Sequence, residues 1–388
     1  MKSRFKDMMN DVVVYGSCCA CGSCVLVCPF NQIQYVDNRP KVVKGDIPDF
    51  CKISEEVGCD ICAQACPGLY PREHHLKEAV FGADRLHEEG FGGYRRILVA
   101  KSKDPRILDR CQDGGIVTTL LVGARRLGLI DGAVVSALDG NERCKPVPKV
   151  VTSEEEIIDA AGSWYTYVPN DLALADAQKK NLKKIAFVGV PCQVTPLRKL
   201  EFVDSGFLKT SEKKKAVLAR QLKFLKGFPE IIALNVGLFC SETFTYDGLM
   251  VNKIEREMGI PLEDVRKFNI KGNILIDKKD GTRCELKLKE AQQYQRPECL
   301  HCADFAAEIA DISCGGVGAT GWTIVVIRTA RGEELFSQIE RAGQVDVRSI
   351  DEFERSKKIM LQLSRKKKER VPIPPGKDEF FIREPLAK

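Results

Sequence analysis

The sequence predicts an α/β protein in which a small cysteine-rich domain precedes a body built on a mixed, largely parallel sheet. Short apolar, β-branched runs alternate with helical stretches from Arg95 onward. Nine of the 17 cysteines lie before that point. The length of 388 residues exceeds what one hydrophobic core usually serves. We therefore expect a cysteine-rich domain with its connector at 1–90, an α/β body at 91–345, and a basic helix with an extended tail at 346–388.

Composition narrows the class of protein. Apolar residues make up 44% and charged residues 29% of the chain, as in soluble globular proteins. No apolar run approaches the roughly 20 residues of a membrane span, and no apolar signal region follows the amino terminus, so we expect a cytoplasmic protein. The net charge of +6 suits anionic cofactors or an acidic partner and is too small to indicate nucleic acid. An odd, clustered set of cysteines in such a chain indicates metal ligation rather than disulfides.

Two cysteine runs define the amino-terminal domain. The first follows C-x2-C-x2-C-x3-C and is completed by Pro29, which is the bacterial ferredoxin pattern. The second keeps C-x2-C-x3-C with Pro67, although seven residues separate its first two cysteines where two are usual. The pair predicts a bacterial-type, two-cluster 2x(4Fe-4S) ferredoxin-like domain. The cysteines of the two runs are Cys18, Cys21, Cys24 and Cys28, then Cys51, Cys59, Cys62 and Cys66.

In such repeats the last cysteine of each run ligates the other cluster. That rule assigns the first cluster to Cys18, Cys21, Cys24 and Cys66. It assigns the second cluster to Cys28, Cys59 and Cys62, with Cys51 as the least constrained fourth ligand. A pair of zinc sites is the alternative, but zinc has no use for the x3-C-P ending. Cys19 lies between ligands and is interpreted as a bystander.

The body is predicted to alternate strands and helices. A capping box, Ser153 with Glu156, begins one helix. The stretch 267–289, with Lys-Lys-Asp-Gly in its middle, predicts a hairpin. The tail 355–370 has a helical pattern rich in Lys and Arg, which indicates either a dock for an acidic partner or a solvated helix face. Strands are expected at 96–100, 132–137, 184–188, 231–239 and 322–327.

Two segments of the body have features of a cofactor site. Asp113 is expected to cap a helix from Gly115 to Leu127 that Gly128 ends. Two glycines at a helix start give an anionic group access to backbone N–H donors, although an ordinary capped helix explains them equally well. The loop 161–169 concentrates aromatic and hydroxyl side chains, which either stack on a flat cofactor or simply pack.

A third group of cysteines lies in the body. Cys192 follows the strand 184–188, and the carboxyl ends of strands are where open α/β sheets bind ligands. Cys299 and Cys302 form a C-x2-C half-site that needs two ligands from elsewhere. Cys192 and Cys240 both follow predicted strand ends. Cys284 and Cys314 are rival candidates, and spacing alone leaves the choice open.

Four linked motifs then give a resemblance. Cys-Gln-Asp-Gly-Gly-Ile-Val-Thr begins at Cys111, Gly-Val-Pro-Cys-Gln at Gly189, Gly-Leu-Phe-Cys-Ser-Glu at Gly237, and Cys-x2-Cys-x-Asp-Phe-x-Ala-Glu-x-Ala-Asp-Ile-Ser at Cys299. Together they resemble the coenzyme F420-reducing hydrogenase beta-subunit family over roughly 94–361. The ferredoxin-like segment placed before that body resembles the electron-input subunit of F420H2 dehydrogenases. The amino-terminal part of F420-dependent sulfite reductases has a similar layout.

The resemblance implies that the α/β body binds FAD, that coenzyme F420 docks against the flavin, and that one 4Fe-4S cluster lies nearby. It places the cluster on Cys192, Cys240, Cys299 and Cys302, and so decides against Cys314. The sequence departs from the pattern at Trp164, where relatives often carry Lys, so FAD is better supported than the identity of its donor. The expected cofactor-binding residues are Gln112, Asp113, Gly114, Gly115, Thr118, Gly162, Ser163, Tyr165, Thr166, Gly189 and Pro191.

The sequence thus predicts an oxidoreductase that moves electrons between coenzyme F420 and one-electron acceptors through FAD and three 4Fe-4S clusters. FAD performs the hydride transfer, so no catalytic side chain is expected. The expected partners are F420 and a protein acceptor or larger redox complex, with no nucleic acid, and with membranes reached only through a partner. NAD(P)H or ferredoxin as donor is one alternative, although no G-x-G-x-x-G follows a strand. The others are a non-enzymatic electron relay and a zinc-containing nucleic-acid binder, which fits the charge but not the ferredoxin runs.

Overall fold

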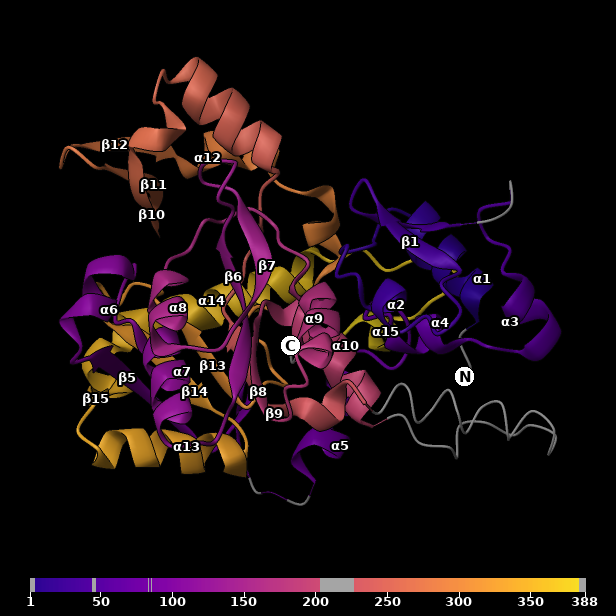
Figure 1. Cartoon of the computed structure of the whole chain (residues 1–388), viewed down its shortest axis with the longest axis horizontal. Coiled ribbons are helices and arrows are strands. Elements are labelled where there is room, and N and C mark those ends of the chain that lie inside the picture. The colour runs from indigo at the N-terminus through magenta and orange to yellow at the C-terminus, as the bar shows by residue number, and fades with distance from the viewer. Residues whose placement is uncertain (1–3, 44–46, 83, 85, 203–226, 384–388) are drawn as a thin grey trace.

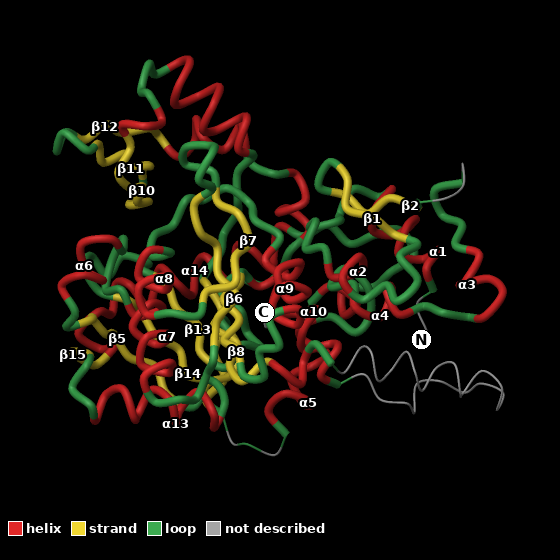
Figure 2. The backbone as a smooth tube through the Cα atoms, in the orientation of Figure 1, coloured by secondary structure: helices red, strands yellow, loops and turns green. Residues whose placement is uncertain are grey.

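The computed structural model describes residues 4–43, 47–82, 84, 86–202 and 227–383. Figure 1 shows the amino-terminal segment on the right, a body with a central sheet on the left, and a small sheet above that body. Figure 2 shows the strands of the body running through its middle with helices on both sides. None of the described helices is both long and apolar enough to cross a membrane.

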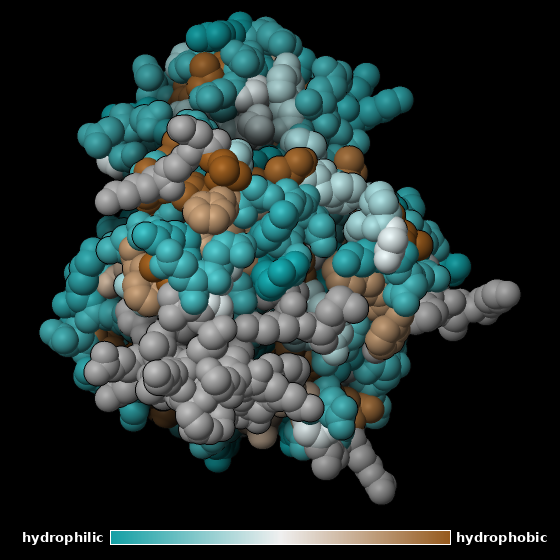
Figure 3. Space-filling view, turned by 90° about the vertical axis from the view of Figure 1, so that its right-hand side faces the viewer, coloured by the Kyte–Doolittle hydropathy of each residue, from teal (hydrophilic) through white to brown (hydrophobic). Residues whose placement is uncertain are grey.

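The amino-terminal segment is built from short elements around a small core. Six of its cysteines belong to that core, where they pack with Phe5, Met8, Ile33 and Leu69. Figure 3 faces this segment and shows hydrophobic side chains on its surface. Exposed residues of this kind are Phe30, Val43, Ile47 and Phe50. The elements are α1 (Phe5–Met8), the π-helical η1 (Met9–Val14), α2 (Ser23–Leu26), β1 (Ile33–Val36), β2 (Arg39–Val42), α3 (Lys52–Val57), α4 (Ile61–Ala65), η2 (Glu73–Leu76), α5 (Lys77–Phe81), β3 (His87–Glu89) and β4 (Gly92–Tyr94).

The long gap between Cys51 and Cys59 is occupied by a helix. Cys51 is the N-cap of α3, and Gly58 ends that helix in the left-handed conformation with φ of 71°. Glycine adopts this conformation at little cost, so the chain can turn back at once. The longer spacing is therefore an inserted helical turn that returns the chain to Cys59.

The body contains a mixed eight-stranded sheet in the order β15-β5-β14-β13-β9-β8-β6-β7. The four central strands, β13, β9, β8 and β6, are parallel, and the flanking pairs are antiparallel. The expected mixed sheet is confirmed, but the expectation of a largely parallel one holds only at its centre. The strands are β5 (Arg96–Ser102), β6 (Gly132–Leu138), β7 (Pro146–Val151), β8 (Ile185–Gly189), β9 (Ile232–Leu238), β13 (Ile312–Gly315), β14 (Thr323–Ile327) and β15 (Val345–Ser349).

All five predicted strands are present, and three others were missed. The missed β7 carries Pro146 and Pro148 and lies at one edge of the sheet, where proline is tolerated. The missed β15 lies at the other edge and carries Asp346 and Arg348. Because both edge strands lack an apolar run, periodicity did not identify them. The third missed strand, β13, has only four residues.

Helices cover both faces of this sheet with apolar side chains. One face packs α7, α8 and α13 against Leu98, Ala100 and Val325. The other packs α9 and α10 against Val134 and Phe187, and the same cluster includes Leu26 and Ile61 of the amino-terminal segment. This hydrophobic cluster therefore joins the amino-terminal segment to the body. The helices are α6 (Pro105–Arg110), α7 (Ile116–Arg126), α8 (Glu154–Asp159), η3 (Asn170–Ala173), α9 (Leu174–Lys179), α10 (Pro191–Glu201) and α13 (Ala330–Arg341).

Of the two predicted helix caps, one is confirmed and one is wrong. The capping box is confirmed, since Glu156 N donates to Ser153 Oγ at 3.1 Å and Ser153 N donates to Glu156 Oε2 at 3.2 Å. The prediction that Asp113 caps α7 is wrong. Gly115 is the N-cap, with φ of 72°, and Asp113 instead accepts from Lys271 Nζ at 2.8 Å. The Asp113 carboxylate therefore pairs with Lys271, which is distant in sequence, and does not cap α7.

A second, three-stranded sheet stands apart from the first. β10 (Val265–Lys271), β11 (Asn273–Lys278) and β12 (Arg283–Lys287) form an antiparallel meander. The predicted hairpin is therefore correct only for β11 and β12, which the Lys-Lys-Asp-Gly turn joins. Gly272, with φ of 81°, makes an additional turn that splits the first arm in two. The elements that precede and follow this sheet in the chain are the π-helical η6 (Tyr246–Glu257), η7 (Leu262–Asp264), α12 (Leu288–Ala291), η8 (Gln292–Tyr294) and η9 (Pro297–His301). The short η5 (Pro229–Ile231) lies instead before β9 and packs with α10.

The carboxyl-terminal region packs back onto the body. It consists of η10 (Ile350–Phe353), α14 (Glu354–Arg370) and α15 (Glu379–Ile382). The predicted basic helix is confirmed as α14. Its basic side chains do not all lie on the surface: Arg365 and Lys366 are exposed, whereas Lys367 is buried. Neither a dock for an acidic partner nor a solvated face therefore describes the whole helix.

One buried carboxylate, that of Asp311, connects the main elements of the body. Its Oδ1 accepts from Arg198 Nη2 of α10 at 2.8 Å and from Arg331 Nε of α13 at 2.7 Å. Its Oδ2 accepts from Asn235 N of β9 at 2.7 Å. Arg198 Nε also donates to Ile309 O at 2.8 Å. Strand β9 and helix α10 are thus fixed relative to one another.

We predict that Asp311→Asn lowers the free energy of unfolding by about 3–5 kcal/mol at pH 7, because Arg198 and Arg331 lose their shared carboxylate and the buried Arg198 keeps only its pair with the partly exposed Glu201. Burial acts to raise the pKa of Asp311, but Arg198 and Arg331 outweigh it and hold that pKa below its ordinary value. The stabilisation is therefore present above the unfolded pKa of about 3.9 and lost as the pH falls through the lower folded value. Urea titrations at pH 7 and in acid measure both effects.

The matched control is Glu352→Gln, which breaks an ion pair whose partners, Arg348 and Glu352, are 51% and 53% exposed. It should change the free energy of unfolding by less than about 1 kcal/mol. Equal losses in the two variants would contradict the structural importance of Asp311.

Candidate functional site

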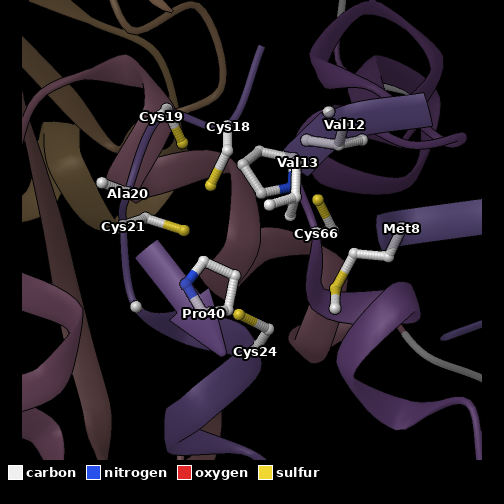
Figure 4. Close-up of a pocket in the computed structure, with 13 residues that line it drawn as sticks. Met8, Val12, Val13, Cys18, Cys19, Ala20, Cys21, Cys24, Pro40 and Cys66 are labelled. Atoms are coloured by element: carbon white, nitrogen blue, oxygen red, sulfur yellow. The ribbon is translucent and has the colours of Figure 1, made fainter. Parts of the chain in front are cut away.

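The first cysteine set lines one cavity of the amino-terminal segment. Cys18, Cys21, Cys24 and Cys66 all border this cavity. Figure 4 shows their sulfur atoms pointing toward a common space. Gly22, with φ of 85°, is the N-cap of α2, and this turn brings the three cysteines of the first run onto one side. The structure thus brings together the four residues that the ligand-exchange rule assigned to the first cluster.

The second set consists of Cys28, Cys51, Cys59 and Cys62, of which Cys51 is the N-cap of α3 and Cys62 lies in α4. Burial raises the pKa of the Cys62 thiol, and its neighbours Cys24, Cys59, Cys28 and Cys51 raise it further. The pKa of Cys59 is raised to about 11, mainly by burial. Gln32 N donates to Cys28 Sγ at 3.2 Å, which is the kind of N–H donor that stabilises a bound thiolate. Cys51, the least constrained of the predicted ligands, lies with this set.

The third set forms where the parallel strands of the body end. Cys192 is the second residue of α10, directly after β8, and Cys240 follows the neighbouring strand β9. Cys299 lies in η9 and Cys302 is its C-cap. Burial raises the pKa of Cys240 to about 12, opposed by Lys367 and aided by Cys299 and Cys302. Thr243 N donates to Cys299 Sγ at 3.4 Å.

The rival cysteines lie elsewhere. Cys314 of β13 is packed in the core of the main sheet, and burial alone raises its pKa to about 12. Cys284 lies in β12 of the small sheet and packs with the apolar cluster there. The geometry therefore groups Cys192 and Cys240 with the half-site of Cys299 and Cys302.

The donor sets suit iron–sulfur clusters better than single metal ions. Within the part of the chain that the structure describes, no three or more Cys, His, Asp or Glu side chains converge closely enough to hold one ion. Four thiols instead surround a shared space in the first set. Thiolates around a space, with backbone N–H groups directed at their sulfurs, are what a multi-atom cluster requires.

The three cysteine sets lie in series, and Cys19 lies between two of them. Hydrogen bonds from the thiols of Cys192 and Cys21 lower the pKa of Cys19, so its sulfur contacts both the third and the first set. The first and second sets meet where Cys24 faces Cys62. The interpretation of Cys19 as a residue that ligates no cluster stays a prediction, but its position between the third and the first set was not expected. The order along the molecule is third, first, second.

The segments predicted to hold the flavin lie together. Gln112 Nε2 donates to Ser163 O at 3.3 Å, which joins the turn of Asp113, Gly114 and Gly115 to the loop of Gly162 and Tyr165. Gln193 links this loop to the turn of Gly189 and Pro191, since it accepts from Val190 N at 3.0 Å and donates to Val168 O. Thr118 is buried in the first turn of α7.

These segments also carry features that fit a bound phosphate-bearing aromatic group. The buried Oγ1 of Thr166 has no hydrogen-bond partner among the described atoms. Gly114 and Gly115 lead into the 11-residue helix α7, whose first N–H groups lack intrahelical partners. Tyr165 adopts φ of 58°, a strained conformation that non-glycine residues keep mainly at functional sites.

A row of polar side chains on β10 borders the same turn and was missed from the sequence. Lys267 Nζ donates to Cys111 O at 3.2 Å, Asn269 Nδ2 donates to Gln112 O at 3.1 Å, and Lys271 pairs with Asp113. Their alternate spacing places the three on one face of the strand. The Lys-x-Asn-x-Lys pattern from Lys267 to Lys271 is the sequence signal that could have identified this polar face. Trp164 packs edge-on against Phe268 at 5.8 Å between ring centroids.

The end of α14 covers the third cysteine set, which the sequence also did not reveal. Lys367 Nζ donates to Cys240 O at 2.5 Å. Arg370 Nη2 donates to Ser241 O at 2.6 Å and to Cys299 O at 3.1 Å. Two basic residues of this helix, Lys367 and Arg370, therefore make their contacts inside the molecule.

Two models of one family, described as "Coenzyme F420 hydrogenase/dehydrogenase, beta subunit", match the body. Residues 97–175 match the amino-terminal model, and residues 182–353 match the carboxyl-terminal model. The chain is 35% identical to a coenzyme F420 hydrogenase subunit beta from Methanococcus voltae over 72% of this chain and 93% of that protein. It is also 35% identical to a coenzyme F420-dependent sulfite reductase from Methanocaldococcus jannaschii over 93% of this chain. It spans only 52% of that reductase.

A solved structure has a similar fold. A chain of the F420-reducing [NiFe] hydrogenase complex from Methanosarcina barkeri superimposes with a TM-score of 0.66 at 30% identity, covering 74% of this chain and 93% of that chain. The expected α/β fold with a large mixed sheet is thereby confirmed.

We predict that Gly316→Ala disturbs the contact between β10 and the turn at Asp113. A Cβ at this position would overlap the Asp113 carboxylate, and Lys271 also donates to Gly316 O at 3.2 Å. Overpacking of this kind costs about 1–3 kcal/mol, which thermal or urea denaturation measures. Gly140→Ala is the control, because nothing lies within 4 Å of its Cβ. An equally small effect at both positions would contradict the close packing.

Proposed function

The chain belongs to the coenzyme F420 hydrogenase/dehydrogenase beta-subunit family, and from this premise we propose that it moves electrons between coenzyme F420 and one-electron acceptors. In this proposal the body holds one FAD and the three cysteine sets hold three 4Fe-4S clusters. The observation that carries it is the series of three cysteine sets that leads away from the candidate flavin segments. A non-redox protein would have no use for such a series.

The cofactors supply the redox chemistry when they are bound: a deazaflavin gives hydride, a flavin accepts it, and iron–sulfur clusters accept single electrons. The task of the chain is to hold and orient them. Cys18, Cys21, Cys24 and Cys66 would hold one cluster, Cys28, Cys51, Cys59 and Cys62 another, and Cys192, Cys240, Cys299 and Cys302 the third.

The flavin would lie against the turn at 112–115 and the loop at 162–166. The amino terminus of α7 favours the negative charge of its phosphates, and Lys267 adds a cation at the same turn, whereas Lys271 is paired with Asp113. Lys267 thus supplies positive charge in a site where Trp164 replaces the lysine of many relatives. Thr166 Oγ1 is free to hydrogen-bond to a bound group. Hydride transfer then needs no acidic or basic side chain from the chain itself.

We further propose that the chain is the electron-input subunit of a larger complex. The second cysteine set is at the far end of the series, and large apolar side chains are exposed close to it in sequence. Phe30 lies two residues after Cys28, and Phe50 directly precedes Cys51. Exposed apolar residues grouped in this way mark surfaces where proteins associate (Figure 3). A protein acceptor docked there would receive electrons from the second set.

The test of the donor is anaerobic reduction of the purified chain by reduced F420 or by NADH, followed in a stopped-flow spectrometer. Reduced F420 should bleach the flavin absorbance and then the broad iron–sulfur absorbance, whereas NADH should do so far more slowly. A faster reaction with NADH would replace F420 as the donor. A chain that lacks flavin but keeps the iron–sulfur absorbance would leave only the electron-relay function.

We predict that Cys51→Ala removes one cluster of three and lowers the iron content from about 12 to about 8 per chain. The reason is that Cys51 lies with Cys28, Cys59 and Cys62 in the second set. The controls are Cys284→Ala and Cys314→Ala, which alter thiols outside the three sets and should retain all the iron. Iron and acid-labile sulfide assays on anaerobic samples measure this. Loss of iron in a control but not in Cys51→Ala would contradict the assignment of the second set.

A further inference from the structure

Only two lysines are buried among the residues that the structure describes. Lys199 is 3% exposed and Lys367 is 4% exposed. Burying an ammonium group is costly unless an opposite charge compensates it. The groups around these two lysines therefore indicate which negative charges compensate them.

Lys199 lies beside the first cysteine set. It is on α10, and its Nζ donates to Cys66 O at 2.6 Å and to Leu69 O at 2.9 Å. The helix that carries Cys192 of the third set in its first turn thus also delivers a cation to the first set. The thiol of Cys66 responds to this charge, because Lys199 opposes the effect of burial on the pKa of Cys66.

Lys367 occupies the equivalent place beside the third set. Its Nζ donates to Cys240 O, and the thiols that act on it most strongly are Cys302, Cys240 and Cys299. Neither Lys367 nor Lys199 forms an ion pair with a carboxylate in the described part of the chain. Backbone carbonyls accept their hydrogen bonds but provide no full negative charge. In both places the opposing charge comes from the neighbouring thiols and from one nearby carboxylate, Glu73 beside Lys199 and Asp304 beside Lys367.

The second set is different. The charged side chain buried next to it is Asp60, a carboxylate, which acts with Cys28 and Cys51 to raise the pKa of Cys59 beyond the effect of burial. No buried lysine of the described chain lies there. The charge beside the cysteines thus changes sign along the series.

We propose that Lys199 and Lys367 set the reduction potentials of two clusters, each raising that of its own cluster and leaving the second cluster the hardest to reduce. This inference rests on the proposed function, because it presupposes clusters in the three sets. Reduction adds one electron and no proton to a cluster, so a fixed cation in a low-dielectric site stabilises the reduced form. Both lysines are positioning residues, since they touch ligand backbone rather than the reacting atoms.

The experiment is an anaerobic redox titration of the full, cluster-loaded chain, with dithionite as reductant and low-temperature electron paramagnetic resonance as readout. Lys367→Met should lower the ratio of reduced to oxidised form of one cluster signal at least tenfold at a fixed ambient potential. For a one-electron couple tenfold corresponds to about 59 mV. Lys199→Met should do the same to a different signal. Each variant should leave the signal affected by the other unchanged.

Two further variants separate charge from packing. Lys367→Arg keeps the cation and should stay close to the wild-type potential. Lys366→Met removes an exposed cation one residue away and should shift no signal. If Lys367→Met loses iron, Lys367→Gln and Lys199→Gln provide the same charge removal with a polar side chain.

A chain that holds about 12 irons but shows no shift in either charge-removing variant would overturn this inference and leave the proposed function standing. Equal shifts of all signals would also overturn it, because they would reflect net charge alone. A wild-type chain without clusters would instead refute the proposed function.

Discussion

The buried ion pair between Arg198 and Asp311 is the constraint on which the arrangement of the body depends. It fixes α10, whose second residue is Cys192, relative to β9, which leads to Cys240. Both charges are out of contact with water, so each depends on its ion pairs, which also include Glu201 for Arg198 and Arg331 for Asp311. Residues that are far apart in sequence are thereby held as one site.

The amino-terminal segment is fixed to the body by ordinary apolar packing. Leu26 and Ile61 belong to the same core cluster as Leu197 and Leu200 of α10. One helix therefore carries Cys192 on its first turn, Arg198 toward the body, and Lys199 toward the first cysteine set. This explains how the first and third sets come to be neighbours, with Cys19 between them.

Local sequence patterns predicted what depends on short-range order. The ferredoxin spacing selected four cysteines that line one cavity, and β-branched runs located three of the four central strands, β6, β8 and β9. Tertiary contacts decided the rest. Asp113 pairs with Lys271, 158 residues away, instead of capping α7. Lys367 is buried over Cys240 although its helix is strongly basic, and Cys19 joins two sets although its spacing fits no motif. Charge that is neutralised by a distant partner leaves no local signal in a sequence.

The central claim is that one chain carries a flavin and three clusters in series. The most direct measurement is a count of iron, acid-labile sulfide, zinc and flavin in the anaerobically purified chain. We expect about 12 irons, an equal amount of sulfide and one FAD per chain. About four irons, or zinc in place of iron, would contradict the claim.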